Sequence, residues 1–271
     1  YDFWKKYTFL SKLNIKDFDQ YFNIRPPKEN LKKDSDFFAS QSVWNLVRNK
    51  KILDVIEKLI GSEINSNPVQ NSRIKQPEKF LKKKTLYDGL SGRTPWHQDA
   101  AVLSKKGQKL TDLITCWVPF TKTTKKNGCM ITVPGLQKKG LFNHDADSKG
   151  QAHIRNSELL NKLKSVALEA NPGDIVLLSK HTVHCSLPNI SNNFRISMDL
   201  RYHKSGQPSG RDLLPNFCVR SKNKKNIKIY NFKQWLTTWE NAKQKCIPKK
   251  HTFKYQTPTF KGKKRDLINL I

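Results

Sequence analysis

Apolar residues between positions 40 and 60 recur at steps of three and four, and Gly61 follows the last of them. That spacing places the apolar side chains on one face of a helix, and glycine often follows a helix end. The pattern predicts an amphipathic helix over residues 40–60 that covers one face of a sheet. Phe232, Trp235 and Trp239 keep the same helical spacing near the other end of the chain.

The hydrophobic pattern changes between residues 86 and 202 to short runs separated by Gly, Pro and Asn. Such runs predict strands, and many of them in succession are typical of a sandwich or barrel. Residues 156–164 predict a short helix or an excursion from the sheet. The predicted strands cover residues 94–102, 113–120, 129–133, 166–168, 175–178, 181–185 and 194–202.

The chain of 271 residues has the length of one all-β domain or of two smaller domains. We expect a single domain over residues 1–271, with a helical layer at 1–85, a β core at 86–211 and a basic extension at 212–271 that docks on the core. The predicted fold class is mainly β with flanking helices.

The chain carries 51 Lys and Arg residues against 22 Asp and Glu residues, a formal net charge of +29. This charge suits a protein that binds nucleic acid or another polyanion. Only ten of the basic residues are Arg, however, and the lysines fall in separate clusters. Because recognition of bases and phosphates favours the bidentate Arg fork, we expect a solvated lysine-rich surface. Polyanion or nucleic-acid binding without turnover is the alternative function.

Five cysteines lie far apart and never form a Cys-x-x-Cys pair, which predicts neither a disulfide framework nor a zinc finger. This cysteine usage favours a reducing cytoplasm. No stretch approaches the roughly 18 apolar residues of a membrane-spanning helix, so we expect no membrane span.

Within the predicted strand 94–102, His97 and Asp99 stand two positions apart. Side chains at this spacing in a strand point to the same side, so the imidazole and the carboxylate form a chelating pair. Such a pair also arises by chance on solvated strands, and a third ligand is needed to define a metal site. His181 and His184 follow in a later predicted strand, and because they stand three apart only one can face this pair.

We favour His184, because the chain turns at residues 188–193 and a hairpin about that turn brings Arg195 opposite His184. Two imidazoles and one carboxylate on one face of an octahedral ion leave three positions open, which suits the binding of a bidentate 2-oxo acid and O2. Arg195 supplies a planar, permanently charged donor pair for the far carboxylate of 2-oxoglutarate. Ser186, two residues beyond His184, adds a hydroxyl donor on the same side of the strand.

Together, these motifs resemble the phytanoyl-CoA dioxygenase family over about residues 85–211. The matching segments are Trp-His-x-Asp at 96–99, a strand with an internal Trp at 117, Asn-Gly-x5-Pro-Gly at 127–135, Gly-Asp at 173–174, and His-x-Ser-x-Pro-Asn-x-Ser at 184–191 followed by Arg195. The resemblance implies a double-stranded β-helix (jelly-roll, cupin-like) core over 86–211. The implied Fe(II) ligands are His97, Asp99 and His184, and the implied 2-oxoglutarate contacts are Arg195, Ser186 and Trp117.

The implied reaction consumes 2-oxoglutarate and O2, releases succinate and CO2, and hydroxylates a small-molecule substrate. This chain has Leu136 and Gln137 where many members of the family have Ser and His, which leaves the role of that region open. Halogenating relatives lack the metal carboxylate. Because Asp99 is present, hydroxylation is expected.

We expect a small, polar, anionic substrate, because Arg201 and Arg211 gather with Gln98 at the expected mouth of the site, where no long apolar run accompanies them. Trp96 is a further candidate for the substrate pocket, with a core role as the alternative. Arg201 shares a strand face with Asp199, so an ion pair between the two is the alternative to a substrate clamp. The resemblance does not choose among substrates.

Overall fold

The structure of the protein is a computed structural model that describes residues 41–81, 92–146, 152–212, 214–222, 226–246 and 267. The chain forms two compact units. We call Tyr1–Pro68 with Asp212–Phe253 the helical unit, and Val69–Arg211 with Lys254–Ile271 the β unit. No helix among the described residues is long and apolar enough to cross a membrane.

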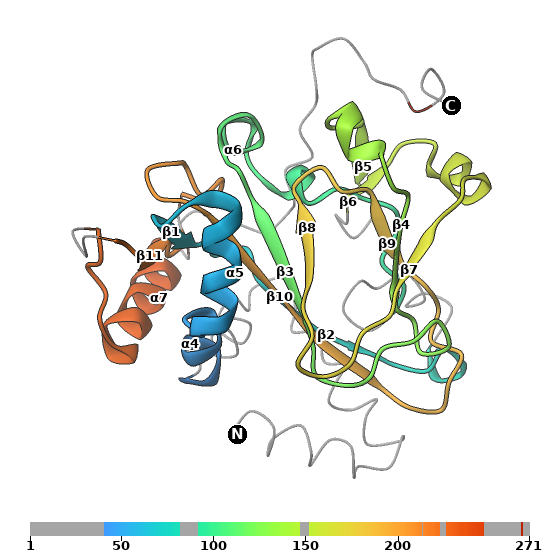
Figure 1. Ribbon diagram of the computed structural model, residues 1–271, viewed down its shortest axis with the longest axis horizontal. Coiled ribbons are helices and arrows are strands. Elements are labelled where there is room, and N and C mark those ends of the chain that lie inside the picture. The colour runs from blue at the N-terminus through green and yellow to red at the C-terminus, as the bar shows by residue number, and fades with distance from the viewer. Residues whose placement is uncertain are drawn as a thin grey trace. The chain divides into compact units, whose positions relative to one another are not determined.

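The described part of the helical unit contains α4 (Gln41–Val47), α5 (Lys50–Ile60), β1 (Ile64–Ser66), β11 (Phe217–Arg220) and α7 (Phe232–Cys246) (Figure 1). The expected single helix over 40–60 is two helices, because the Asn49 side chain accepts hydrogen bonds from two backbone N–H groups of the next turn and so starts α5. Gly61 ends α5 with a φ of 85°, in the left-handed region that glycine favours.

Three aromatic rings pack together in the helical unit. Trp44 of α4 stacks on Phe217 of β11 with ring centroids 5.5 Å apart, and Trp235 of α7 lies 5.5 Å from Trp44 and 5.9 Å from Phe217. The helix predicted from the aromatic spacing is therefore α7, and it packs on α4 and β11 of its own unit. Docking of residues 212–271 on the β core stays a prediction.

The β unit is built on two antiparallel sheets. In the larger one, β10 (Arg195–Lys204) pairs with both β2 (Asn71–Lys75) and β3 (Ile114–Pro119), and β3 pairs with β8 (Val176–Ser179). The smaller sheet has the order β7 (Val166–Leu168), β4 (Met130–Thr132), β9 (His184–Ser186). A separate hairpin pairs β5 (His144–Ala146) with β6 (Ala152–Ile154).

Short helices connect these strands. They are η1 (Glu78–Phe80), η3 (Asp99–Val102), α6 (Lys105–Leu110), η4 (Leu136–Lys139) and η5 (Ser157–Lys162). The last of these is the helix predicted at residues 156–164, formed as a 3-10 helix.

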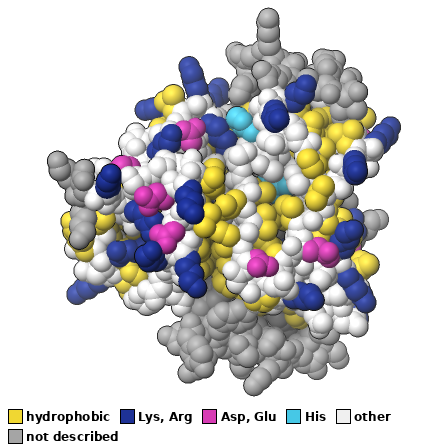
Figure 2. Space-filling view, in the orientation of Figure 1, with side chains coloured by type: hydrophobic (Ala, Val, Ile, Leu, Met, Phe, Trp, Pro, Cys, Tyr) yellow, Lys and Arg dark blue, Asp and Glu magenta, His cyan; other side chains and the backbone are white. Residues whose placement is uncertain are grey.

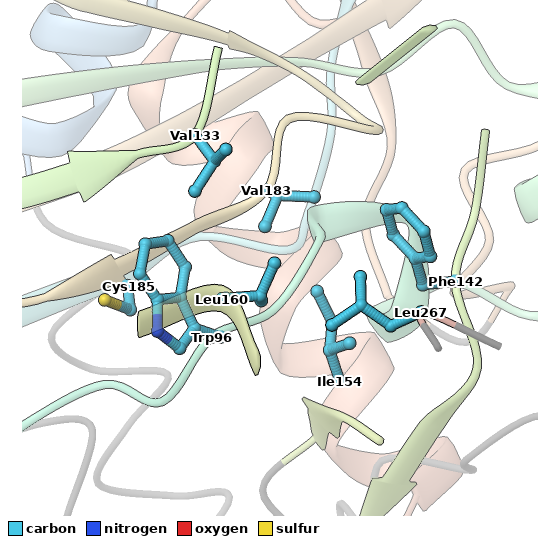
Figure 3. Packing of buried hydrophobic residues seen from close by; sticks show 8 residues of the cluster. All are labelled: Trp96, Val133, Phe142, Ile154, Leu160, Val183, Cys185 and Leu267. Atoms are coloured by element: carbon cyan, nitrogen blue, oxygen red, sulfur yellow. The ribbon is translucent and has the colours of Figure 1, made fainter. Parts of the chain in front are cut away.

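Each face of the smaller sheet packs against a buried cluster. Met130 packs with Trp117 of β3 and Leu178 of β8, which joins the smaller sheet to the larger one. Cys185 alternates with the residues of that face and belongs to a second buried cluster, drawn in Figure 3, and the partly buried Ile131, paired with Cys185, packs against this cluster. Two facing antiparallel sheets around a buried interior form the jelly roll that was expected.

The segments around this interior differ from the expected strands. Residues 94–102 are not a strand: His97 makes an isolated bridge to His184, and the N–H of Ala101 then bonds back to the Gln98 carbonyl and starts η3. The strand expected at 181–185 begins only at His184. β2, which pairs with β10, lies ahead of residue 86, at which the β core was predicted to begin.

Candidate active site

His97 and His184 face each other across an antiparallel bridge. The N–H of each residue donates to the carbonyl of the other, over 2.9 Å from His97 and 3.1 Å from His184. Residues directly opposite in such a pair present their side chains on the same face. The centroids of the two imidazole rings consequently lie 4.2 Å apart.

A carbonyl two residues earlier in the chain fixes the tautomer of each imidazole. His97 Nδ1 lies 2.8 Å from the Pro95 oxygen, and His184 Nδ1 lies 2.9 Å from the Thr182 oxygen. A carbonyl oxygen only accepts, so each Nδ1 carries a proton, and in a neutral ring Nε2 then keeps its lone pair. Burial, together with the neighbouring His184, holds the pKa of His97 well below its usual value. A neutral imidazole with an available Nε2 is the form that binds a divalent metal.

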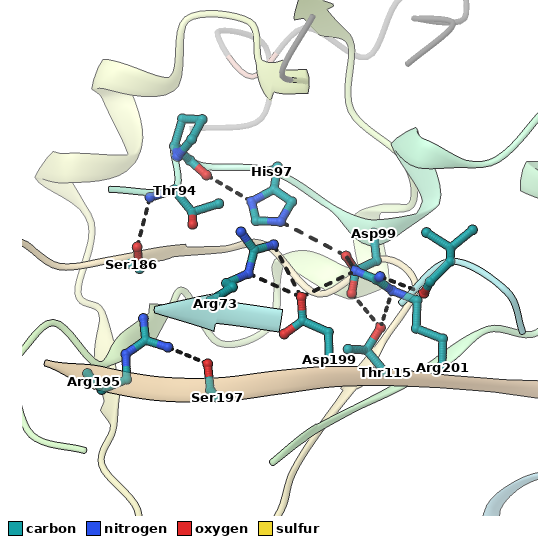
Figure 4. A network of polar contacts seen from close by, with 12 residues as sticks. Arg73, Thr94, His97, Asp99, Thr115, Ser186, Arg195, Ser197, Asp199 and Arg201 are labelled. Carbon is teal, nitrogen blue, oxygen red and sulfur yellow. Dashed lines mark hydrogen bonds and ion pairs between the residues drawn. The ribbon is translucent and has the colours of Figure 1, made fainter. Parts of the chain in front are cut away.

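Asp99 joins the two histidines from the first turn of η3. Arg201 Nη2 donates to its Oδ1 over 2.7 Å, and Thr115 Oγ1 donates to its Oδ2 over 2.5 Å (Figure 4). Burial by itself would raise the pKa of Asp99, but the Arg201 charge and the Thr115 hydrogen bond more than offset it and leave the pKa below its usual value. The carboxylate is therefore ionised and fixed in orientation.

His97, Asp99 and His184 each offer one ligand atom, and these atoms all lie within 4.8 Å of one another. All three residues are buried. Two neutral imidazoles and one carboxylate are the donor set of the non-haem Fe(II) oxygenases, which leave three positions open for co-substrate and O2. The donor set fits Fe(II), and the structure brings together the three ligands that were predicted.

Arg195 lies in the same pocket as this group, and residues of both sheets line that pocket. Arg195 is 1% exposed and donates from Nη1 to Ser197 Oγ and from Nη2 to the Gly128 carbonyl, whereas its Nε has no hydrogen-bond partner among the residues that the structure describes. Burial lowers its pKa to about 10, so the guanidinium remains charged at neutral pH. A buried cation with an unsatisfied N–H is costly unless an anion meets it, which fits the far carboxylate of 2-oxoglutarate.

Arg195 reaches the pocket through a strand pairing different from the expected hairpin. β9 pairs with β4, and Arg195 stands opposite Lys75 of β2 rather than opposite His184. The chain crosses from the smaller to the larger sheet between β9 and β10, so His184 and Arg195 approach the pocket from facing sheets. Asn189 holds this crossing, because its side-chain amide donates to the Lys75 carbonyl.

Trp117 and Ser186, the other predicted co-substrate contacts, also line the pocket. The guanidinium carbon of Arg195 lies 5.5 Å from the centroid of the Trp117 ring, within range of a cation–π contact. Ser186 Oγ accepts from Lys75 Nζ and from the Thr94 N–H, both over 2.8 Å. Two acceptor sites are then used, and the Ser186 proton is left to donate.

Three of the four residues predicted to touch the substrate are not among the residues that line the pocket. Trp96 donates from Nε1 to Asn161 and belongs to the cluster in Figure 3. Gln98 is fully buried, and its side chain bonds to backbone groups of residues 140, 142 and 181. Arg211 is not among the residues that line the pocket.

Arg201 does line the pocket, but it already forms an ion pair with a carboxylate of the protein. It donates to Asp99 over 2.7 Å, and Asp199, the partner considered from the sequence, lies at 3.9 Å. It also donates to the Thr115 hydroxyl and the Val69 carbonyl. This guanidinium therefore holds a candidate metal ligand, and its role as a substrate clamp stays a prediction that no contact supports.

Arg73 and Thr115 line the pocket, and Lys75 donates to Ser186 of the pocket lining; none of the three was predicted. They lie on β2 and β3, whose registers with β10 place them beside the buried arginines of that strand. Period-two alternation puts Arg73 and Lys75 on one face of a strand. The sequence does not show with which strand β2 pairs. The alternation of Arg73 and Lys75 therefore did not by itself place them near the site.

A jelly roll with two histidines and an aspartate converging in its interior has the architecture of the non-haem metal-dependent oxygenases. A family model described as phytanoyl-CoA dioxygenase (PhyH) matches residues 11–197. The chain belongs to this family.

Curated relatives carry related descriptions. A probable phytanoyl-CoA dioxygenase of Caenorhabditis elegans is 26% identical over 178 residues, which cover 64% of this chain and 54% of that protein. A phytanoyl-CoA dioxygenase domain-containing protein 1 homolog of Dictyostelium discoideum is 36% identical over 121 residues, which cover 42% of this chain and 41% of that protein. The chain thus spans about half the length of these relatives, or less.

A solved structure shares the fold. The non-heme monooxygenase ThoJ in its apo form aligns with a TM-score of 0.55 and 18% identity, over 77% of this chain and 76% of that chain. At this identity the likeness supports the jelly-roll fold alone.

Proposed function

We propose that the protein is an Fe(II)- and 2-oxoglutarate-dependent dioxygenase that hydroxylates a small polar metabolite with an anionic group. One observation carries the proposal: a single pocket contains both the His97, Asp99 and His184 group and the buried Arg195, whose Nε has no partner. 2-Oxoglutarate has a 2-oxo acid end for the metal and a distant carboxylate for a guanidinium. The two parts of the pocket match these two ends.

Fe(II), when bound by the three ligands, supplies the redox chemistry that couples decarboxylation of 2-oxoglutarate to hydroxylation. One 2-oxoglutarate, one O2 and one C–H bond give succinate, CO2 and one C–OH group. Arg201 and Thr115 keep the Asp99 carboxylate ionised and oriented. The facing sheets bury His97 and His184 to 7% and 5% exposure, which keeps bulk water from the ligand atoms.

Arg73 replaces Arg201 and Arg211 as the proposed partner of the anionic substrate. It lines the pocket, and its side chain is 16% exposed against 2% for that of Arg201. Asp199 accepts from its Nε and lies equally near its Nη2, with 3.2 Å to each nitrogen. A guanidinium fixed in this way and reached by solvent fits a small carboxylate or phosphonate.

The surface charge supports capture of small anions. On the face shown in Figure 2, Lys and Arg side chains lie in separate groups among hydrophobic and acidic ones. Dispersed positive charge raises the local concentration of anions and speeds their approach. Polyanion binding without turnover stays the alternative prediction, and retention on a polyanion column that falls steeply with salt would favour it.

Succinate formation tests the proposal. We expect the protein, loaded with Fe(II) without oxygen and then given O2, to form succinate from 2-oxoglutarate, and a panel of small carboxylates and phosphonates to contain stimulating compounds. Absence of succinate across the panel would overturn the dioxygenase assignment. Stimulation only by long acyl-CoA esters or cationic solutes, or stimulation unaffected by Arg73→Met, would overturn the assignment of an anionic substrate to Arg73.

A further inference from the structure

Two cations lie side by side in the larger sheet. Lys75, the last residue of β2, is 2% exposed and stands opposite Arg195 in the register of β2 with β10. Opposite residues of an antiparallel pair point to the same face, and like charges in this position repel. Among the described residues no carboxylate forms a salt bridge with either cation: Glu78, the nearby acid, is bound by Arg93.

The hydrogen bonds of Lys75 control the Ser186 proton. Lys75 Nζ contacts the carbonyls of Gly92 and Leu187 over 2.8 and 2.9 Å, and Ser186 Oγ over 2.8 Å. Both carbonyls need a donor. A charged ammonium has a third proton for Ser186, so the hydroxyl proton stays free for the pocket. A neutral amine has only two protons, and its lone pair would take the hydroxyl proton instead.

Gly128 fixes the positions of both cations. It has a φ of +84°, and a Cβ there would come within 2.5 Å of Lys75 Cδ and 2.7 Å of the Leu187 oxygen. Only glycine allows this approach without a shift of the chain. The Gly128 carbonyl also accepts from Arg195 Nη2 over 3.3 Å. The turn at Gly128 therefore contacts both Lys75 and Arg195.

We propose that Lys75 is a positioning residue for 2-oxoglutarate: as a cation it directs the Ser186 hydroxyl proton into the pocket and adds a second positive charge beside Arg195. The inference rests on the proposed function, because 2-oxoglutarate is the anion concerned. A dianion in the pocket offsets the repulsion between the two cations. Bound 2-oxoglutarate and the charged form of Lys75 therefore stabilise each other.

Calorimetric titration of 2-oxoglutarate into the full chain, loaded with Mn(II) and kept free of oxygen, tests the proposal. The variants are Lys75→Met, which keeps the length of the side chain without its charge, Ser186→Ala, and the double variant. Lys180→Met is the matched control, because Lys180 Nζ also donates to two backbone carbonyls, whereas the hydrogen bond to Ser186 comes from Lys75.

We expect Lys75→Met to weaken 2-oxoglutarate binding about tenfold or more, in line with the loss of a hydrogen bond to a charged group. Ser186→Ala should weaken it less. The double variant should bind about as weakly as Lys75→Met, because the two residues act together and their effects do not add. Lys180→Met should bind as the unmodified chain does.

Unchanged affinity in Lys75→Met, with or without a loss of thermal stability, would show a purely structural role and overturn the proposal. Additive effects in the double variant would overturn the action through Ser186. If Lys75→Met does not fold, Lys75→Gln, which keeps two donors without the charge, and Ser186→Ala decide the question, and unchanged binding in either overturns it. If the unmodified chain binds no 2-oxoglutarate at all, the dioxygenase assignment itself fails, a result distinct from the others.

Discussion

Arg195 and Arg201 stand near the two ends of the inward-facing row of β10, and both are buried, at 1% and 2% exposure. Their surroundings differ. Arg201 bonds to the Asp99 carboxylate, the Thr115 hydroxyl and the Val69 carbonyl. Within the described part of the chain, Arg195 meets a hydroxyl and a carbonyl but no carboxylate, and its Nε has no partner.

This difference separates a structural cation from a cation that needs a ligand. A buried charge is stable where an opposite charge and hydrogen bonds meet it, as they do at Arg201. Arg195 is buried to a similar extent without a carboxylate partner, so no ion pair offsets the free energy of its desolvation. Burial alone therefore does not distinguish the two arginines, whereas their partners do, and substitutions at one end of the row should differ in effect from those at the other.

The largest expected effect lies at the metal end. His97→Ala, Asp99→Ala and His184→Ala should each abolish Fe(II)-dependent formation of succinate from 2-oxoglutarate, because each removes one of three converging ligands. His181→Ala should keep much of the activity. Retained iron binding in His184→Ala with its loss in His181→Ala would reverse the assignment of the third ligand.

Arg201→Met and Arg195→Met should differ in stability. Removal of Arg201 leaves Asp99 buried without its counter-charge, and breaking a buried pair in this way costs about 3–5 kcal/mol. Removal of Arg195 takes away a cation that has no carboxylate, so its variant should lose far less stability or gain some. Urea unfolding of the two metal-free variants gives both values, and equal losses would contradict the comparison.

The sequence predicted which three residues converge, but not the backbone structure that brings them together. His97 and Asp99 were placed together by strand alternation, but Asp99 reaches the site because the chain turns into η3. His184 was placed by a hairpin that does not form, since β9 pairs with β4. The fold class followed from short strands and turns, which are local signals.

The residues that the sequence did not reveal depend on long-range register. Lys75 matters because β2 pairs with β10, and Arg201 contacts Asp99 only because η3 lies over the larger sheet. Strand alternation gives the face of a side chain but not the neighbouring strand. For the same reason the sequence assigned Arg201 and Gln98 to the substrate, whereas their partners are Asp99 and backbone groups.

A smaller effect is expected from Arg195→Lys. The substitution keeps the charge but loses the planar donor pair, and a charge-assisted bidentate pair is worth about 1.5–3 kcal/mol. The concentration of 2-oxoglutarate at half-maximal rate should rise more than that of the primary substrate. An unchanged dependence on 2-oxoglutarate would remove Arg195 from the co-substrate site, whatever the result for Arg201→Met.

The smallest expected effect is a pH dependence of 2-oxoglutarate binding. Burial, with the nearby Arg195 and Arg73, lowers the pKa of Lys75 well below its usual value, and Glu78 opposes the shift. Below this lowered pKa the cation is fully present, and it is lost as the pH rises through that value, so binding should weaken with rising pH by at most about tenfold per unit. Arg195 titrates only near pH 10, and burial raises the pKa of Cys185 to about 12. Titration of 2-oxoglutarate into the Mn(II)-loaded chain at several pH values gives the dependence of its affinity on pH. We expect Lys75→Met to flatten this dependence and Lys180→Met to keep it. An equal dependence in both variants and the unmodified chain would mean that another group is responsible.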